Sequence, residues 1–227
     1  QEAPTAQAYA ADDGSTSTGD LYSYGAFGAD DRAFGTLRSA GTGSNEPYIG
    51  LRLTNNSGRT IRAFTVGYTG EEWRLGITNR APPSDQIIFG YLINATALNT
   101  SGYTDVSGLE FSSPSSSGGA GPRNGNNASF RTVISPVTFT LSVGLGQGDT
   151  VWLRWLDFNV TSSDDGLAVD DFSLIAHECT TASDCDDSDA CTDDSCSNSV
   201  CVNSTITCDD GKSCTTNDCN PASGCEY

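Results

Sequence analysis

The sequence of 227 residues has no methionine, a single histidine and a single lysine. One histidine excludes a metal site built from several histidines and a proton relay between two of them. No stretch approaches the roughly 18 consecutive apolar residues that a membrane helix needs, so we expect no membrane span. Because an initiator methionine is missing, we expect Gln1 to follow a signal peptide that has been removed.

Basic residues are also scarce, with 11 Lys and Arg against 29 Asp and Glu, for a net charge of −18. Such a chain repels phosphate backbones and anionic lipids, so we expect no nucleic-acid partner. The charge is uneven: residues 177–227 contain eleven acidic residues and only Lys212, which gives −10, and all nine cysteines follow residue 178. This change predicts a domain boundary near 176–177.

The region before this boundary predicts an arm and a β domain. Residues 1–20 are small and polar, have too few apolar side chains to fold alone, and are expected to form an extended N-terminal arm. In residues 21–176, short segments alternate apolar and polar residues and are separated by Gly, Asn, Ser or Pro clusters. These segments are 48–55, 61–68, 86–94, 133–143, 150–158 and 167–176. The pattern predicts an all-β fold, an antiparallel two-sheet β-sandwich that is jelly-roll-like.

Four motifs in this region support a family resemblance. They are AFGTLRS at 33–39, YIGLRLTNNSGRTIRAFTVGYTGEEWR at 48–74, VWLRWLDFN at 151–159 and SSDDGLAVDDFSLIA at 162–176. In their order they resemble a secreted bacterial β-sandwich module of surface-anchored and adhesin-like proteins, over about residues 30–176. The resemblance implies an extracellular domain without catalytic activity.

Residues 177–227 contain an internal repeat of about 23 residues. The segment CDDSDACTDDSC at 185–196 aligns with CDDGKSCTTNDC at 208–219, and Cys201 aligns with Cys225 after one extra residue. With few apolar residues, this region must be held by disulfides or a metal. It resembles the cysteine-rich CT-x-D-x-C repeats of Dictyostelium-type extracellular matrix proteins, which implies a matrix or surface role.

Disulfides are the preferred interpretation of the cysteines, because paired C-x-x-C zinc motifs are absent and clustered cysteines are typical of an oxidising, extracellular setting. The candidates are Cys179, Cys185, Cys191, Cys196, Cys201, Cys208, Cys214, Cys219 and Cys225. The pairing cannot be read from the sequence, but an odd count leaves one cysteine over. We expect this to be Cys179 or Cys225, the two ends of the series, either pairing with another subunit or meeting further chain.

Calcium is the only cofactor that the sequence suggests. Carboxylates that flank one loop and its neighbouring strands offer the hard oxygens that calcium prefers. They belong to Asp157, Asp164, Asp165, Asp170 and Asp171. The alternative is that residues 164–166 form a polar turn and that Asp170 and Asp171 cap strand ends.

No arrangement of residues predicts an enzyme. The nucleophile motif G-x-S-x-G is absent, and His177 lies at the domain junction without a nucleophile motif. Glu71 and Glu72 are adjacent, so in a strand they point to opposite faces and cannot form the carboxylate pair of a glycosidase. We therefore expect no catalytic activity.

Two features concern glycans. Six N-x-S/T sequons are glycosylation candidates, at Asn55, Asn94, Asn99, Asn127, Asn159 and Asn203. Aromatic side chains that could stack on sugars are Trp152, Trp155, Tyr22, Tyr24, Tyr91 and Tyr103, although ordinary packing within the sandwich is the preferred explanation. The odd separation of Trp152 and Trp155 places them on opposite faces of one strand, so at least one belongs to the core.

These observations favour a secreted or cell-surface structural protein. The hypothesis is a subunit of an extracellular filament or surface matrix, in which copies of the chain assemble through the N-terminal arm and the sandwich. As a whole the chain resembles a glycosylated extracellular fibril subunit. The alternative is a carbohydrate-binding or adhesive module on a cell surface.

Overall fold

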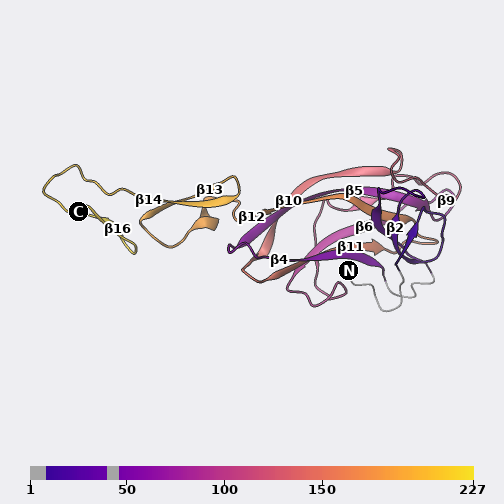
Figure 1. Ribbon diagram of the computed structural model, residues 1–227, viewed down its shortest axis with the longest axis horizontal. Coiled ribbons are helices and arrows are strands. Elements are labelled where there is room, and N and C mark those ends of the chain that lie inside the picture. The colour runs from indigo at the N-terminus through magenta and orange to yellow at the C-terminus, as the bar shows by residue number, and fades with distance from the viewer. Residues whose placement is uncertain (1–8, 40–45) are drawn as a thin grey trace. The chain divides into compact units, whose positions relative to one another are not determined.

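The computed structural model describes residues 9–39 and 46–227, which form an all-β protein with one short 3-10 helix, η2 (Ala182–Cys185) (Figure 1). Two sheets make up the sandwich. The seven-stranded sheet has the order β1 (Tyr9–Asp12), β2 (Asp20–Tyr24), β3 (Ala33–Leu37), β12 (Gly166–His177), β5 (Ile61–Leu75) and β10 (Arg131–Leu145), with β9 (Gly121–Pro122) also paired to β5. The five-stranded sheet has the order β4 (Tyr48–Thr54), β11 (Thr150–Phe158), β6 (Gln86–Ile93) and β7 (Thr104–Asp105), with β8 (Phe111–Ser112) also paired to β6.

The predicted two-sheet sandwich is confirmed, and the strands form where the alternating segments predict them. β11 pairs antiparallel with both β4 and β6, which places Trp155 opposite Ile49 on one side and Phe89 on the other. One pair departs from the antiparallel prediction: β1 runs parallel to β2, with Tyr9 opposite Leu21. The seven residues from 13 to 19 connect these two strands, far fewer than the dozen or more that parallel neighbours usually require.

Aromatic rings fill the space between the sheets. Trp155 of β11 lies edge-on to Tyr68 of β5 at 5.6 Å between ring centroids, and to Phe172 of β12 at 5.5 Å. Phe89, its neighbour on β6, lies 5.1 Å away. Burying rings of this size removes a large apolar area from water, and these contacts join the two sheets.

Strand β5 is buried continuously from Val66 to Trp73, instead of alternating as an antiparallel strand with one solvent face would. The segment after β8 covers it: the amide of Glu72 donates to the carbonyl of Phe130, and the amide of Arg123 donates to the carbonyl of Trp73. The predicted strand 61–68 is therefore too short. Its extension to Leu75 carries both adjacent glutamates into the interior.

The chain divides into two compact units. The first contains the chain up to Thr54 together with 66–137 and 148–174. The second contains 55–65, 138–147 and 175–227. The second unit thus includes strand ends of β5 and β10, whereas the sequence predicts a boundary at 176–177. Contacts explain the difference: the Arg59 guanidinium lies 2.8 Å from the Glu178 carboxylate, and the Thr65 hydroxyl lies 2.6 Å from Nε2 of His177.

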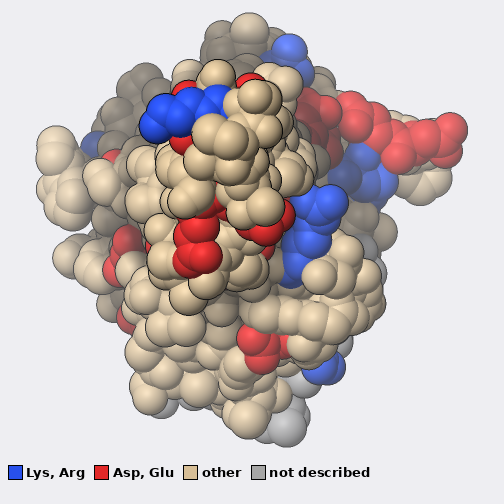
Figure 2. All heavy atoms as spheres, turned by 90° about the vertical axis from the view of Figure 1, so that its left-hand side faces the viewer, with Lys and Arg blue, Asp and Glu red and all other residues tan. Residues whose placement is uncertain are grey.

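The repeat region consists of two small hairpins. β13 (Thr192–Ser197) pairs with β14 (Val200–Thr205), and β15 (Asp218–Asn220) pairs with β16 (Gly224–Glu226). No helix among the described residues is long and apolar enough to cross a membrane. On the face that Figure 2 displays, the acidic and basic side chains lie in separate small groups among uncharged surface.

Candidate functional site

The N-terminal arm ends in an anchored loop. Residues 1–8 lie outside the described residues, and residues 9–12 form β1. The Asp12 carboxylate accepts hydrogen bonds from the amides of Gly14 at 2.6 Å and Thr16 at 3.4 Å. A Cβ on Gly14, whose φ is +87°, would lie 1.8 Å from the carbonyl oxygen of Trp73, so only glycine permits this approach. The loop is therefore fixed against β5.

Strand β1 itself is lightly held. It contributes four residues at the end of the seven-stranded sheet, and both Ala10 and Ala11 are exposed. Short exposed edge segments have low local stability, because few apolar contacts oppose their detachment. The arm therefore combines a hydrogen-bonded loop at residues 12–16 with a lightly held strand before it.

A group of buried carboxylates lies in the first unit. Asp85, Asp157 and Asp165 are fully buried, and Asp164 is 4% exposed. The Thr36 hydroxyl donates to Oδ2 of Asp157 at 2.8 Å, and the Asp165 amide donates to Oδ2 of Asp85 at 2.5 Å. Within the described part of the chain, the other oxygen of Asp157, Oδ1, has no hydrogen-bond partner.

One arginine compensates only part of this charge. Arg80 is 6% exposed and its guanidinium lies 2.7 Å from Oδ1 of Asp165, with a second bond to the Ser163 carbonyl. Burial raises the pKa of Asp85 to about 8 and that of Asp164 to about 6. Burial, reinforced by the charge of Asp85, raises the pKa of Asp157 well above its usual value. Near neutral pH the cluster therefore holds protons in place of a counter-ion.

The structure does not bring all five aspartates of the calcium prediction together. Asp157, Asp164 and Asp165 belong to the buried cluster, but Asp170 and Asp171 lie on β12, where the Asp171 carboxylate accepts a bond from the Thr69 hydroxyl at 3.0 Å. Sequence reasoning missed Asp85, Arg80 and Thr36. Asp85 follows the turn-like segment 81–84, and nothing in its local pattern distinguishes it from a solvated loop residue.

In the described part of the chain, groups of residues with the spacing of metal ligands occur in the repeats alone. Among the described residues, groups of three or more potential ligands within 4.8 Å of one another are formed by cysteines alone. They are Cys179, Cys185 and Cys201, and Cys208, Cys219 and Cys225. All six of these sulfurs belong to disulfides, so they offer no thiolate to zinc. Carboxylate oxygens of the buried cluster would have to move to surround one cation.

Glu71 and Glu72 are also buried. Oε2 of Glu71 accepts a bond from Nε1 of Trp73 at 2.8 Å, and Oε2 of Glu72 accepts one from the Ser115 amide at 2.9 Å. Burial raises the pKa of each to about 7. Neither glutamate lines the pocket described next; both side chains are buried in the packing around β5.

A polar pocket of about 470 Å³ opens beside the carboxylate cluster. Its lining includes Arg38, Arg74, Asn159 and Asp164, together with serines at 162 and 163. Guanidinium, amide and hydroxyl groups of this kind hydrogen-bond hydroxylated or anionic small molecules. Asn159 is also a sequon, so a glycan there would begin at the rim of this pocket.

The aromatic residues considered as sugar platforms are mostly buried. Trp155 belongs to the core, while Trp152 packs with Tyr48 and Leu98 in a separate small cluster. Tyr22, Tyr24 and Tyr91 are at most 5% exposed, and Tyr103 is half-buried against the Arg154 guanidinium. The tryptophans do occupy opposite faces as expected, but neither forms an open stacking surface.

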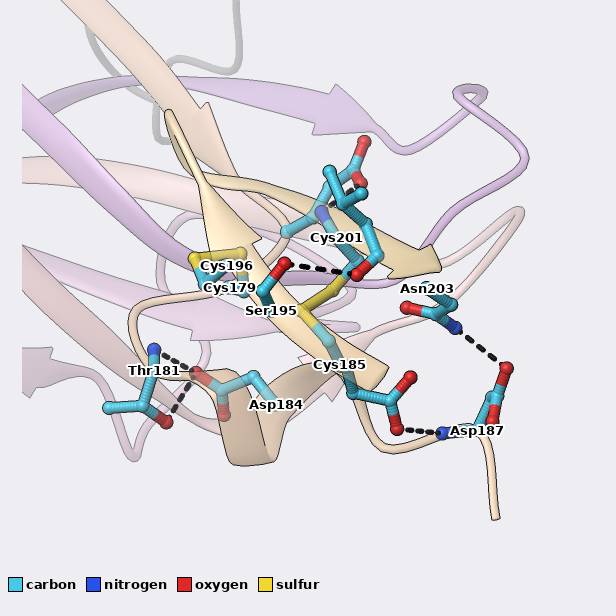
Figure 3. The surroundings of a disulfide bond; sticks show 12 residues. Cys179, Thr181, Asp184, Cys185, Asp187, Ser195, Cys196, Cys201 and Asn203 are labelled. Carbon is cyan, nitrogen blue, oxygen red and sulfur yellow. Dashed lines mark hydrogen bonds between the residues drawn. A yellow bond between two sulfur atoms is a disulfide. The ribbon is translucent and has the colours of Figure 1, made fainter. Parts of the chain in front are cut away.

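Four disulfides hold the repeats, and Figure 3 shows the surroundings of Cys179–Cys196 and Cys185–Cys201. The four disulfides are Cys179–Cys196, Cys185–Cys201, Cys191–Cys219 and Cys208–Cys225. The unpaired cysteine is Cys214, so the expectation that Cys179 or Cys225 would be left over is wrong. Both end cysteines bond to partners 17 residues away, whereas position in the sequence had made them the obvious unpaired members.

The six sequons differ in accessibility. Asn94, Asn99, Asn127, Asn159 and Asn203 are exposed. Asn55 is 7% exposed, and its side-chain amide donates to the carbonyls of Arg59 at 2.6 Å and Leu145 at 2.7 Å. A glycan on Asn55 would replace one of the two Nδ2 hydrogens and break one of these donated bonds in a buried site, so the structure separates this sequon from the other five.

We predict that this difference decides glycan occupancy in a eukaryotic secretory host. Asn99→Gln should remove the mass of one N-glycan, while Asn55→Gln should leave the glycan mass of the folded, secreted protein unchanged. Intact-protein mass spectrometry before and after enzymatic deglycosylation measures both. Loss of a glycan in the Asn55→Gln variant would contradict the prediction.

Comparisons of the chain with protein-family models, curated proteins and solved structures find no match. The function must therefore be argued from the molecule itself. Its four disulfides are typical of an oxidising compartment, extracellular or otherwise outside the cytoplasm.

Proposed function

We propose that the chain is a secreted structural subunit of an extracellular filament or cell-surface matrix. Copies join when the N-terminal arm of one copy pairs with the sheet edge of the next. The observation that carries this proposal is the β1–β2 pair, a parallel edge strand on a seven-residue connection. The β2 edge already accepts this strand, so a second copy offers the same acceptor.

The exchange costs little free energy. Moving β1 from its own β2 to that of a neighbour replaces each backbone hydrogen bond with an identical one. The loop that follows must move with the strand, so the bonds that the Arg74 guanidinium donates to the carbonyls of Gly14 at 2.9 Å and Ser15 at 3.2 Å are replaced by the same bonds from Arg74 of the neighbour. Head-to-tail exchange produces a filament when the rotation between copies does not close a ring, whereas reciprocal exchange produces a dimer.

The remaining features suit a surface assembly. Disulfides maintain a region that has almost no apolar core, which is valuable outside the cell. The resemblance of the repeats to extracellular matrix repeats supports the same role. Exposed sequons would give such an assembly a glycan coat, and no catalytic activity is part of this proposal.

An engineered cysteine pair tests the exchange directly. Ala11 and Ser23 face each other in the β1–β2 register, so Ala11→Cys with Ser23→Cys should cross-link this pair. Cys214→Ser in the same chain removes the competing thiol. After assembly and oxidation, non-reducing electrophoresis should show a ladder of covalent oligomers, because each bond joins two copies.

Controls separate assembly from folding. Deletion of residues 1–12 should abolish filaments in electron micrographs, while Val200→Lys, an exposed change in the repeat region, should leave them intact. A cross-linked species that migrates only as a monomer would show that β1 stays on its own chain. A full-length protein that remains monomeric at every concentration would contradict the filament proposal as well.

The polar pocket supports a second candidate, a carbohydrate-binding or adhesive surface module. Its arginine, asparagine and serine side chains fit hydroxyl-rich ligands. Binding of the monomer to a glycan array, lost on Arg74→Ala and retained in the chain without residues 1–12, would favour this candidate over the filament subunit.

A further inference from the structure

Each repeat contains four cysteines, here numbered by their order. The first repeat has Cys185, Cys191, Cys196 and Cys201; the second has Cys208, Cys214, Cys219 and Cys225. We propose that Cys214 is a docking cysteine, which forms a disulfide with the third cysteine of a further hairpin of the same repeat type.

The disulfides follow one rule in both repeats. The first cysteine bonds to the fourth of its own repeat, as in Cys185–Cys201 and Cys208–Cys225. The third cysteine bonds backwards: Cys219 bonds to Cys191, the second cysteine of the preceding repeat. Cys196 likewise bonds backwards to Cys179, which precedes the first repeat (Figure 3). The second cysteine of a repeat is thus the attachment point for the next hairpin.

A backbone hydrogen bond repeats together with each backward disulfide. The amide of Glu178, just before Cys179, donates at 3.0 Å to the carbonyl of Ser199 at the tip of the β13–β14 hairpin. The amide of Ala190, just before Cys191, donates at 2.7 Å to Pro221 at the tip of the β15–β16 hairpin. In the second repeat, Ser213 and Cys214 occupy the positions of Ala190 and Cys191. The Ser213 amide is therefore the equivalent hydrogen-bond donor, and Cys214 is the equivalent attachment cysteine.

The loop that presents Cys214 has the same internal bonds as the loop that presents Cys191. The Thr192 hydroxyl donates to Oδ1 of Asp187 at 2.9 Å, and the Thr215 hydroxyl donates to Oδ1 of Asp210 at 2.9 Å. In each loop this same oxygen also accepts an amide bond at 2.9 Å, from the residue two positions on. The loop of the second repeat already has the docked conformation.

Burial distinguishes the occupied positions from the open one. Cys179 is 1% exposed and Cys191 is 8% exposed, each beneath the hairpin that it binds, whereas Cys214 is exposed. The β15–β16 hairpin lies close to the loop that carries Cys191: a Cβ at Gly224 of β16 would lie 3.6 Å from the Ala190 carbonyl oxygen. A hairpin docked at Ser213 would bury Cys214 in the same manner.

The partner is defined by its chemistry. It is a short hairpin whose first strand carries a free thiol, as the third cysteine does. Cys196 and Cys219 are already bonded, so a second copy of the described repeats offers no third cysteine. Joining the two thiols releases two protons and two electrons, which a small disulfide such as glutathione disulfide accepts as it becomes two reduced thiols.

The test extends the full chain by one repeat. A copy of residues 204–227 is added after Tyr227, with arginine in place of the copied Lys212 so that its peptides differ in mass. The protein is refolded in a glutathione redox buffer, alkylated without reduction and cleaved before aspartates, which isolates Cys214 on the peptide 210–217. Alkylation of Cys214, complete in the original chain, should be lost, and its peptide should be disulfide-linked to the copied Cys219.

A second variant keeps the test independent of folding efficiency. In the extended chain, Cys214→Ser should make the thiol of the copied Cys219 open to alkylation, while the other bridges stay protected. Non-reducing electrophoresis distinguishes a link within one chain from a link between two chains, and either result supports the proposal. A Cys214 that stays alkylatable, or that bonds to Cys214 of another copy, would overturn it.

Discussion

The free energy of unfolding should fall as the pH rises from about 5 to about 8, by about 1.4 kcal/mol per pH unit for each buried carboxyl that keeps its proton. Asp85 and Asp157 are the main contributors. Burial raises the pKa of Asp85 to about 8 and that of Asp157 well above its ordinary value. In the unfolded chain both carboxyls titrate near 3.9.

The sign follows from the proton count. Between these two pKa ranges the native state holds more protons than the unfolded state, so a rise in pH favours unfolding. Chemical denaturation at a series of pH values measures the slope. Many proteins lose stability in acid because their paired carboxylates must be protonated; here mild acid should stabilise the sandwich.

Asp157→Asn should flatten this profile. An amide keeps the size of the protonated carboxyl and can still accept the Thr36 hydroxyl, but it cannot ionise. The slope of the variant should be shallower than that of the original protein, because the native state of the variant carries one fewer carboxyl that holds a proton. Asp171→Asn, an exposed change on β12, is the matched control and should leave the slope unaltered. An unchanged profile in Asp157→Asn would show that Asp157 is not a buried proton carrier.

The same variants test the calcium prediction. A cation in the cluster would neutralise the carboxylates that ionise at high pH, so millimolar calcium at pH 8 should raise the unfolding temperature of the original protein. Asp157→Asn should abolish this rise and Asp171→Asn should not. If calcium changes neither protein, the calcium prediction is wrong.

Trp73→Ala should be the most damaging single change in the sandwich, costing about 3–5 kcal/mol from the lost ring and about 1–3 kcal/mol more from the bond lost by Glu71. The indole is 1% exposed, stacks on Tyr24 at 5.9 Å between ring centroids, and donates to buried Glu71. A sum of this size approaches the whole stability of a typical domain. Circular dichroism during denaturant titration measures it.

Two comparisons apportion this effect. Trp73→Phe keeps a ring against Tyr24 but removes the indole donor, so it should show only the cost of leaving Glu71 unpaired. Trp152→Ala removes a ring from a smaller cluster with Tyr48 and Leu98 and should cost less than Trp73→Ala. Equal losses at the two tryptophans would contradict the special role given to Trp73.

The strands could be predicted from the sequence because their signal is local. Alternation at 48–55, 86–94 and 150–158 identifies β4, β6 and β11 within one residue of their ends. The arm also alternates, with alanine at 6, 8 and 10, but its sequence does not say which strand it joins: Tyr9–Asp12 pairs with β2, whose free edge only the assembled sheet provides. Long burial along β5 also depends on the segment 121–130, which folds over it from far along the chain.

The site residues show the same limit. The repeat reveals which cysteines are equivalent, yet pairing depends on which hairpin docks on which loop, so the ends of the series were mistaken for the unpaired members. The aspartates 164 and 165 could be found from their position after a strand. Asp85 could not, because its burial depends on the three-dimensional arrangement of Arg80 and the loop at 163–165.

The backward disulfides have a mechanical consequence. A pulling force that enters at Cys179 crosses to Cys196, runs back along residues 191–196, and crosses again to Cys219. All other backbone between Cys179 and Cys219 lies outside this covalent route and bears no tension. Rupture of every hydrogen bond in the two hairpins would therefore lengthen the chain very little. The remaining backbone could extend only after a reductant breaks these disulfides.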